Sequence, residues 1–351
     1  MIIEDVKKNK NLVTSKNYYL KKNNVLPIKI NKKIEIIIVP KPINLNEHQK
    51  NVGIKLDEKL ILKIISRRYM HVLITEINSE KDLENMALRK PDLVFSGVKY
   101  FNFNTKIVWL NDYLDLLGIP YIASNRAALD NESNKILAKK IIKKNQIKTA
   151  DFFIAEPGKY LNKLSMPIDF PLFVKPVSGG DSIGINSKSI VHDFVAFEKK
   201  VLDIKLKQNS SALVETYLSG KEYSVGIFED SYNHSLKAMP IEISVKANNE
   251  GYQILDFDVK KNDTEIVLPV KDSKIFNDLS KLAKDAFTAL GGKSLGRIDI
   301  KMNHLGVPHF IEANLMPGLQ QGYFYRSCVL NLDMNYDDMI LSIANTGLTS
   351  H

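Results

Sequence analysis

The 351-residue chain contains a single cysteine, Cys328. One cysteine excludes an intrachain disulfide framework and fits a reducing compartment. No apolar run approaches the roughly 20 residues that a membrane-spanning helix needs. The acidic start, Met-Ile-Ile-Glu-Asp, leads into a polar Lys/Asn stretch and lacks the pattern of a secretory signal. These absences predict a cytoplasmic protein with no membrane partner.

Net positive charge is concentrated at one end of the chain. The net charge is +9, but residues 1–33 hold nine lysines against Glu4 and Asp5, so this segment alone carries +7 and the remainder +2. A near-neutral body does not indicate a nucleic-acid-binding groove. We interpret residues 1–33 as a basic N-terminal extension that is solvated or loosely docked. Nucleic-acid binding through this extension is an alternative that rests on charge alone.

The first part of the chain alternates strand and helix patterns. Helices are predicted near 57–69 and over 105–117, where Gly118 would end the second one. Strands are predicted from apolar runs at 34–40, 72–77, 92–96 and 119–124. Alternation on this scale predicts a parallel sheet covered on both faces. We assign residues 34–133 to this N-terminal α/β domain.

After about residue 133 the pattern becomes α+β. A small unit, 134–220, is predicted from a basic amphipathic helix at 131–145, a second helix at 193–204, and strands at 152–156, 170–177 and 212–218. A second unit, 221–351, is predicted from strands at 222–228 and 237–244 and from a helix at 273–290. Ser273 is the expected N-cap of that helix, and Gly291 and Gly292 follow it.

Two strand-like segments near the end of the chain carry paired polar residues. Glu312 and Asn314 lie two apart in "FIEANLMPG", and Arg297 and Asp299 lie two apart in "GRIDI", so each pair shares a face of its strand. A turn at 303–306 would join the strands as a hairpin. If the faces match, two carboxylates converge, and a hard divalent cation such as Mg²⁺ would remove their repulsion. A merely solvated polar face is the alternative.

Two other segments suggest a nucleotide. "FVKPVSGGDSIGI", 173–185, joins Lys175 to a loop of small residues whose backbone N–H groups could surround phosphate oxygens. It matches neither the P-loop nor the dinucleotide-binding glycine pattern. "LVETYLSGKEYSV", 213–225, places Glu215 and Glu222 around backbone that could contact adenine and ribose. For both segments an ordinary surface hairpin remains the alternative.

In order and spacing these motifs resemble the ATP-grasp enzymes, and within them the D-alanine–D-alanine ligase group. The resemblance covers about residues 130–325 through six ordered segments: "SNKILAKK", "FVKPVSGGDSIGI", "LVETYLSGKEYSV", "DFDVKKNDTEIVLPV", "LGGKSLGRIDI" and "HFIEANLMPG". It implies an N-terminal parallel-sheet domain and two α+β subdomains that grip ATP. The implied enzyme joins the carboxylate of an amino acid to an amine through an acyl phosphate and releases ADP and phosphate. The implied partners are ATP and amino-acid-like molecules, and a homodimer is left open.

The resemblance also implies roles for individual residues. Two Mg²⁺ ions, or Mn²⁺ in their place, would be held by Asp299, Glu312 and Asn314. Arg297, Lys260 and Ser182 would act in catalysis. The expected ATP-binding residues are Lys135, Lys175, Gly180, Asp181, Ser182, Glu215, Leu218, Glu222 and Lys260. The expected substrate residues are Arg297, Gly318, Gln320, Gln321, Gly322 and Tyr323.

The substrate-facing segments depart from the family's pattern. The family's Ser-x-Glu-x-x-Val-Ser pattern is replaced by "KPINLNEHQKNVG", its His-Gly and Gly-Glu-Asp-Gly loop by "SGVKYFNFNTKIVW", and its Ser-rich acceptor segment by "LQQGYFYR". In the last of these, Tyr323 could wall a larger pocket and Arg326 could pair with a carboxylate. We therefore expect a product other than D-alanyl-D-alanine. An authentic D-alanine–D-alanine ligase and a catalytically silent ATP-binding regulatory protein are the alternatives.

Overall fold

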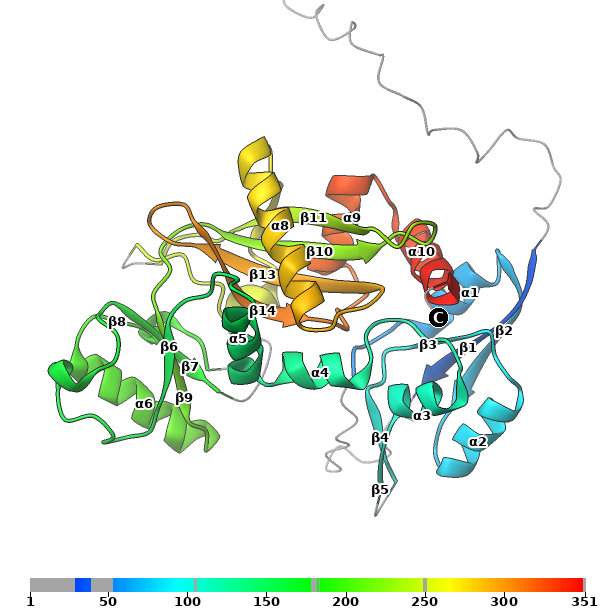
Figure 1. Ribbon diagram of the computed structural model, residues 1–351, viewed down its shortest axis with the longest axis horizontal. Helices are drawn as coiled ribbons and strands as arrows, with labels where there is room; N and C mark the ends of the chain where they lie inside the picture. Colours follow the sequence, from blue (N-terminus) through cyan, green and yellow to red (C-terminus); the bar gives the residue numbers. More distant parts are fainter. Residues whose placement is uncertain are drawn as a thin grey trace, which may run out of the picture.

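A computed structural model of the protein describes residues 29–38, 53–103, 106–177, 182, 184–248 and 251–349. These residues form three main sheets with helices packed around them (Figure 1). Of the predicted basic extension, 1–33, the structure describes only residues 29–33, and β1 begins at Ile30. Residues 30–33 therefore belong to a strand, and the expected strand start at residue 34 is wrong by four residues.

The N-terminal sheet has three parallel strands in the order β2-β1-β3, formed by β1 (Ile30–Ile38), β2 (Tyr69–Glu76) and β3 (Leu93–Ser96). On one face Ile34 and Ile36 pack with α1 (Glu58–Ile65) and α10 (Tyr336–Thr349). On the other face Ile37 packs with α2 (Glu80–Leu88) and α3 (Leu110–Leu117). The continuous apolar run of β1 is explained by this burial on both sides, and the prediction of a covered parallel sheet is confirmed.

Two element predictions in this domain are wrong. The expected helix over 105–117 is divided: β4 (Tyr100–Phe103) and β5 (Lys106–Trp109) form a hairpin, and only then does α3 begin. The hairpin is stabilised by the pairing of Tyr100 with Trp109, whose ring centroids lie 5.1 Å apart. The expected strand at 119–124 is reduced to one parallel bridge between Tyr121 and Val94. Gly118, with φ of 63°, ends α3 as expected.

The basic helix expected at 131–145 consists of two helices, α4 (Arg126–Ser133) and α5 (Lys135–Lys144). Asn134 interrupts them with φ of −98° and ψ of 94°, and its side chain accepts a hydrogen bond from Leu137 N. The asparagine therefore caps α5 and sets its direction. Lys135 is the first residue of α5, so this break fixes where its side chain starts.

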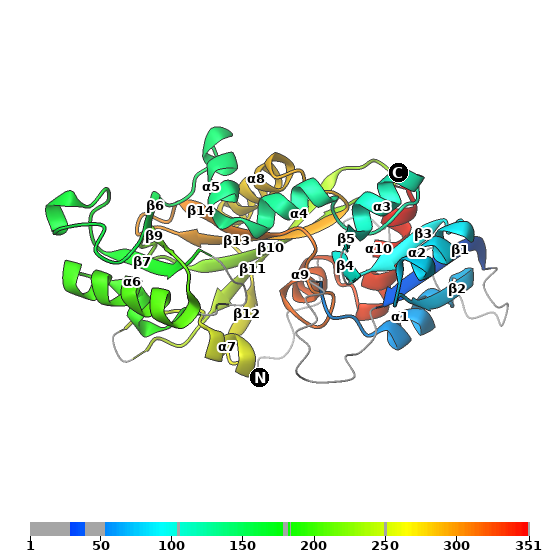
Figure 2. The same ribbon diagram turned by 90° about the horizontal axis from the view of Figure 1, so that it is seen from below.

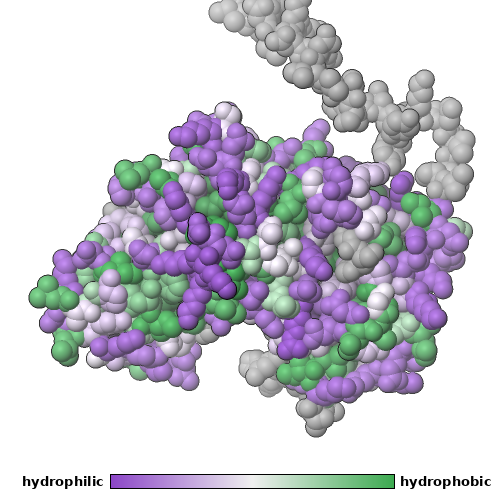
Figure 3. All heavy atoms as spheres, viewed as in Figure 1, coloured by the Kyte–Doolittle hydropathy of each residue, from purple (hydrophilic) through white to green (hydrophobic). Residues whose placement is uncertain are grey.

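The central sheet has the order β6-β9-β7-β8 and is antiparallel throughout. Its strands are β6 (Phe152–Ala155), β7 (Leu172–Pro176), β8 (Ile190–Val191) and β9 (Ala212–Thr216), with short 3-10 helices at η1 (Lys163–Ser165) and η2 (Ser187–Ser189). Phe197, Val201 and Ile204 of α6 (Phe194–Gln208) pack into the core of this lobe. The lobe lies at one end of the molecule (Figure 1), and Figure 3 shows the surface notched between it and the N-terminal domain.

The largest sheet is antiparallel with the order β12-β11-β10-β13-β14. It contains β10 (Glu222–Glu229), β11 (Leu236–Ser244), β12 (Ile266–Pro269), β13 (Leu295–Met302) and β14 (Pro308–Asn314), and α7 (Phe257–Asn262) lies between β11 and β12. Phe287 of α8 (Ser273–Ala289) lies close to Gly296 on one face. Ser327 of α9 (Tyr323–Leu332) lies close to Gly226 on the other, so the two helices cover opposite faces (Figure 2). The N-cap of α8 is Asp272, not the expected Ser273, because the Asp272 carboxylate accepts from Ile275 N.

The last helix, α10, packs against the N-terminal sheet. Met339, Ile340 and Ile343 of α10 are fully buried in the same core cluster as Ile61 of α1 and Leu93 of β3. A helix at the end of the predicted C-terminal unit thus covers the N-terminal sheet. None of the described helices is long and apolar enough to cross a membrane.

Candidate active site

The β13–β14 hairpin brings four predicted site residues onto one face of the large sheet. In its antiparallel register Arg297 lies opposite Asn314, and Asp299 lies opposite Glu312. Directly opposite residues point to the same side of a sheet, so the convergence expected from the sequence is confirmed. A register shift between Asp299 and Ile300 places a bulge beside the two carboxylates, and such bulges re-aim neighbouring side chains.

Arg297 and Asp299 form a buried ion pair. Arg297 donates from Nε to Asp299 Oδ1 at 3.0 Å and from Nη2 to Oδ2 at 2.8 Å, and Ser224 on β10 donates to Oδ1 at 2.7 Å. Burial by itself would raise the pKa of Asp299, but the guanidinium outweighs it and holds that pKa below the usual range. Asp299 is therefore an ionised carboxylate in the fold.

Glu312 and Asn314 contribute polar atoms that the protein leaves unsatisfied. Among the described residues Glu312 has no hydrogen-bond or ion-pair partner, and Asn314 Nδ2 is buried without one. No group of three or more His, Cys, Asp or Glu side chains that could hold a metal occurs in the described ranges. The predicted metal set instead offers two carboxylates and one amide oxygen. Oxygen donors of this kind, with ligand and water oxygens completing the shell, fit Mg²⁺.

Glu215 lies between two buried lysines. Its carboxylate contacts Lys139 Nζ through Oε1 and Lys175 Nζ through Oε2, the second at 2.7 Å. Burial favours the protonated acid, but the two ammonium groups outweigh it and hold the pKa of Glu215 at about 2. Lys139 also donates to Thr149 Oγ1 at 2.7 Å, and Thr149 donates to the Phe310 carbonyl at 2.8 Å. The cluster thus links α5, the central sheet and β14.

Sequence reasoning missed Lys139. It follows Lys135 by four residues and so lies on the same face of α5. The spacing is visible in the sequence, but α5 has five lysines and the spacing alone does not show which of them are buried. Lys135 is placed as expected, and burial together with the nearby Lys175 lowers the pKa of its ammonium group.

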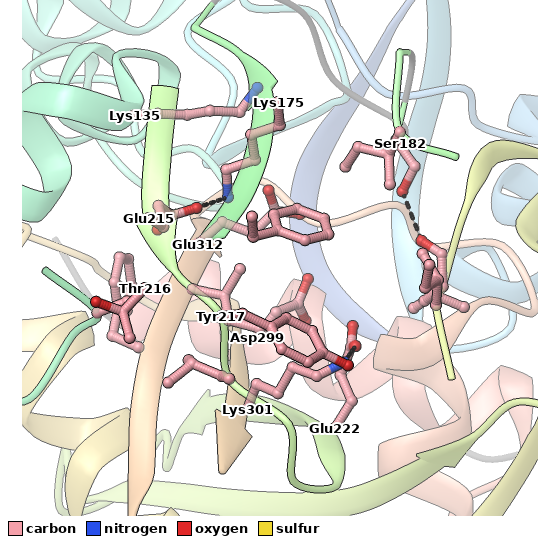
Figure 4. A pocket seen from close by; sticks show the side chains of 18 of the residues that line it. Lys135, Lys175, Ser182, Glu215, Thr216, Tyr217, Glu222, Asp299, Lys301 and Glu312 are labelled. Carbon is pink, nitrogen blue, oxygen red and sulfur yellow. Dashed lines mark hydrogen bonds and ion pairs between the residues drawn. The ribbon is translucent and has the colours of Figure 1, made fainter. Parts of the chain in front are cut away.

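These groups surround a cleft of about 970 Å³ that opens to solvent between the central and large sheets (Figure 4). Nine predicted site residues line it: Lys135, Lys175, Ser182, Glu215, Leu218, Glu222, Lys260, Asp299 and Glu312. Its apolar walls were not predicted, and they include Phe173, Ile185, Tyr217, Ile254, Leu255 and Phe310. A cleft with apolar walls and a few convergent charges is typical of a small-molecule site.

Glu222 and Lys301 lie at the opposite end of this cleft from Lys135 and Lys175 (Figure 4). Lys301 Nζ donates to Glu222 Oε2 at 2.9 Å, and both side chains are less than one quarter exposed. Lysine 301 was not predicted. Its aliphatic stem can wall the cleft while its ammonium group holds the carboxylate.

The small-residue loop is described only at its end. Gly180 and Asp181 lie outside the described residues, whereas Ser182 lines the cleft and donates from Oγ to Leu255 O at 3.1 Å. Gly184 and Asn186 follow Ser182 in the chain, and both accept hydrogen bonds from the buried Lys200 of α6, at 2.9 Å to Gly184 O and at 3.1 Å to Asn186 Oδ1. Lys260 on α7 lines the same cleft.

The segment after β14 lies beside the cleft and does not line it. Gly318, Gln320 and Gln321 precede α9, and Gly322 is the N-cap of that helix. The ring of Tyr323 lies 5.5 Å from the Arg297 guanidinium carbon, and its hydroxyl donates to Glu265 Oε1 at 2.8 Å. Burial and this hydrogen bond raise the pKa of Tyr323, so the hydroxyl remains protonated.

Arg326 pairs with carboxylates of the protein itself. It donates from Nη2 to Asp263 Oδ1 and Oδ2 at 2.6 and 2.8 Å, and its Nη1 lies 3.6 Å from Glu265 Oε1. Two protein carboxylates therefore neutralise the arginine. Sequence spacing could not show this, because Asp263 and Glu265 come from the segment between α7 and β12, about 60 residues earlier in the chain.

The structure is similar to solved ligases. Over 91% of this chain and 98% of theirs, it aligns with the D-alanine–D-alanine ligase from Bacillus anthracis complexed with ATP, with a TM-score of 0.64 and 21% identity. Over 91% of this chain and 100% of the other, it aligns with the VanG D-Ala:D-Ser ligase from Enterococcus faecalis, with a TM-score of 0.61 and 17% identity. The fold is therefore the ATP-grasp fold, as predicted.

Sequence comparison gives the family. The chain is 29% identical over 235 residues to D-alanine–D-alanine ligase of Lacticaseibacillus casei (strain BL23) and 30% identical over 233 residues to that of Pediococcus pentosaceus, each alignment covering 66% of this chain. The aligned regions span about three fifths of those relatives, 61% and 62%. D-alanine–D-alanine ligase A of Bacillus cereus is 25% identical over 303 residues, 86% of this chain and 94% of the relative.

A family model described as "D-ala D-ala ligase C-terminus" matches residues 140–345. That match includes the central sheet from β6, the large sheet and the hairpin that carries Asp299 and Glu312. Because it covers more than half of the chain, this protein belongs to the D-alanine–D-alanine ligase family.

Proposed function

We propose that this protein is an ATP-dependent ligase that joins a carboxylate, that of an amino acid, to an amine through an acyl phosphate. The observation that carries this proposal is the convergence of opposite charges in one cleft. The cations available for a triphosphate are Lys135, Lys175 and Lys260. The same cleft is lined by Asp299 from β13 and by Glu312 from β14. Such an arrangement suits the binding of a nucleotide with divalent cations.

In the first step, a carboxylate oxygen of the donor substrate attacks the γ-phosphorus of ATP. The bond between that phosphorus and the β–γ bridging oxygen breaks, ADP leaves, and an acyl phosphate remains. Lys135, Lys175 and Lys260 hold the phosphate oxygens in place for this displacement. Two Mg²⁺ ions held by Asp299, Glu312 and Asn314 would supply neutralisation of the phosphate charge when bound.

In the second step, the amine nitrogen attacks the acyl carbon, the carbon–oxygen bond to phosphate breaks, and the departing phosphate takes up the proton that the amine loses. Negative charge develops on the acyl oxygen. Arg297 is buried and its guanidinium is fixed by Asp299 on one side and the Tyr323 ring on the other. A guanidinium that needs no reorganisation can stabilise this charge as it forms.

We further propose that the product is not D-alanyl-D-alanine. Two contacts support this part. The Tyr323 hydroxyl is already bonded to Glu265, and Arg326 is already paired with Asp263. The Tyr323 ring therefore lies beside Arg297 with its hydroxyl already bonded, the Arg326 guanidinium is already neutralised, and an acceptor larger than alanine suits this surface. The names of the relatives favour the other candidate, an authentic D-alanine–D-alanine ligase.

The test is release of ADP and phosphate from ATP and Mg²⁺, first with D-alanine alone and then with a panel of larger amines and amino acids. We expect weak turnover with D-alanine and stronger turnover with a larger acceptor. Efficient D-alanyl-D-alanine formation with no gain from any other acceptor would establish the authentic ligase. Tight ATP binding without release of ADP for any pair would favour the catalytically silent protein.

A further inference from the structure

Glu132, in the last turn of α4, joins three separate parts of the chain. Its Oε1 accepts a hydrogen bond from Lys99 Nζ at 2.6 Å, and its Oε2 accepts one from Leu315 N. Lys99 follows β3 of the N-terminal sheet, and Leu315 directly follows Asn314 at the end of β14. Only 8% of the Glu132 side chain and 15% of the Lys99 side chain are exposed.

Local energetics do not account for a carboxylate at this position. A negative charge in the last turn of a helix is opposed by the helix dipole. A buried ion pair also adds little net stability compared with apolar side chains of the same size, because both charges must be desolvated. The contact that distinguishes Glu132 is the one with Leu315 N, since it satisfies a backbone donor at the end of the strand that carries Glu312 and Asn314.

Other contacts already fasten this part of the chain to the large-sheet unit. Asn131 donates to Leu290 O at 3.2 Å, and Lys293 N donates to Ser124 Oγ at 3.0 Å. These bonds reach the end of α8 and the start of β13, whereas Glu132 reaches the end of β14. Glu132 also lies three residues before Lys135. One short segment therefore contains a lysine that lines the cleft and the carboxylate that contacts the end of β14.

We propose that Glu132 is a positioning residue that fixes the backbone after β14 and thereby the orientation of Glu312 and Asn314. Lys99 pairs with the Glu132 carboxylate from the N-terminal domain. The effect on turnover rests on the proposed ligase function, whereas the effect on the backbone and on cation-dependent nucleotide binding does not. Loss of a residue that orients metal ligands typically costs about 10- to 100-fold in metal affinity or activity.

The experiment compares Glu132→Ala with Glu132→Gln and with the double variant Lys99→Met/Glu132→Gln. The glutamine retains an oxygen that can accept from Leu315 N, and the double variant removes both charges without leaving either one unpaired. Asp130→Ala is the matched control on the same helix, because Asp130 is 48% exposed and its carboxylate forms an ion pair only with Arg126 within the described part of the chain.

The readouts are amide hydrogen exchange at Leu315, the Mg²⁺ concentration for half-maximal ATP binding by calorimetry, and kcat against KM for ADP release. In Glu132→Ala we expect faster exchange at Leu315, a Mg²⁺ requirement raised by about 10- to 100-fold, and a lower kcat. Both glutamine variants should remain close to the wild type. A folded Glu132→Ala protein with unchanged exchange and Mg²⁺ requirement would overturn the proposal.

Equal impairment of the glutamine variants would also overturn it, because the charge and not the backbone contact would then matter. If the wild type binds ATP but releases no ADP with any substrate pair, the ligase function fails. In that case the exchange and Mg²⁺ measurements still decide the role of Glu132. If Glu132→Ala does not fold, the double variant carries the test: altered Leu315 exchange there excludes the positioning role.

Discussion

Glu215 is a buried carboxylate that two buried lysines share, and this arrangement predicts an order of stabilities. Glu215→Gln leaves Lys139 and Lys175 together without their anion, and breaking a buried ionic group in this way costs about 3–5 kcal/mol. Lys139→Met leaves a balanced Glu215–Lys175 pair, so its loss should be smaller. Urea unfolding of the two variants measures the difference. The cluster would need a different explanation if Lys139→Met were the more damaging change.

In contrast to Glu215, Glu312 is expected to contribute little to folding stability and much to the rate of ADP formation. Among the described residues no hydrogen bond or ion pair joins its carboxylate to another side chain, and the nearby Lys175 and Arg297 keep Glu215 and Asp299 as partners. Glu312→Gln should therefore keep the melting temperature but lower ADP formation by several orders of magnitude, because charge and positioning supply most of the catalysis in phosphoryl transfer. Glu84→Gln, on the exposed face of α2, is the matched control. Near-normal ADP formation by Glu312→Gln would reject the metal assignment.

At the residue scale the sequence predicted charged groups well and their partners poorly. Strand alternation placed Arg297 with Asp299, and Glu312 with Asn314, on one face of each strand, but only the hairpin register shows that the two faces coincide. Local pattern could not reveal that Arg326 is neutralised by Asp263, or that Lys139 is buried. Those facts depend on packing between distant segments, and a lysine on a basic helix has the same local pattern whether it is exposed or buried.

At the scale of elements, strong periodicity was a reliable guide and short segments were not. The apolar face of α8 and the strands β10, β11, β13 and β14 were all predicted. β5 was mistaken for part of α3 although Ile107, Val108 and Trp109 favour a strand, because this four-residue segment runs directly into the helical pattern that begins at Leu110. The break at Asn134 was missed for a similar reason, since the capping asparagine lies inside a continuous amphipathic pattern.

The hydrogen bonds from Lys200 of α6 to Gly184 and Asn186, at the end of the small-residue loop, should affect the pH dependence of stability. Burial lowers the pKa of Lys200 to about 8, whereas the unfolded chain keeps the ordinary value of 10.5. Between these values the unfolded state binds more protons, so the free energy of unfolding rises with pH over the window from about 8 to 10.5. The full difference corresponds to about 3 kcal/mol.

The measurement is urea unfolding of the wild type and Lys200→Met at several pH values from 7 to 10.5. The wild type should gain stability relative to the variant as the pH rises, because only the wild type can release this proton. Groups that titrate in both proteins cancel in the comparison. A constant difference across the window would show that the Lys200 ammonium group is not penalised in the fold.

At the scale of the whole molecule, the order of segments along the chain does not match the order of the packed units. The predicted division assigned residues 221–351 to one subdomain, yet α10 buries its apolar face against α1 and β3 at the other end of the chain. α10 also contacts the large-sheet unit, where Thr346 donates to Glu229 O at 3.1 Å and Asn345 donates to Ser231 Oγ at 2.8 Å. Local pattern shows that a helix has an apolar face but not which sheet it covers.

This bridging predicts that the N-terminal sheet loses stability when α10 is weakened. Ile340 is fully buried, and large-to-small core changes such as Ile340→Ala cost about 2–5 kcal/mol. The only tryptophan of the chain, Trp109, is the last residue of β5 in the N-terminal domain and the N-cap of α3, so its fluorescence reports on that domain. Far-ultraviolet circular dichroism reports on the secondary structure of the whole chain. We expect Ile340→Ala to move both unfolding transitions to lower urea concentration. Leu116→Ala, at a position 86% exposed, should move neither. A fluorescence transition that stays in place while the circular dichroism transition shifts would show that α10 stabilises only the large-sheet unit.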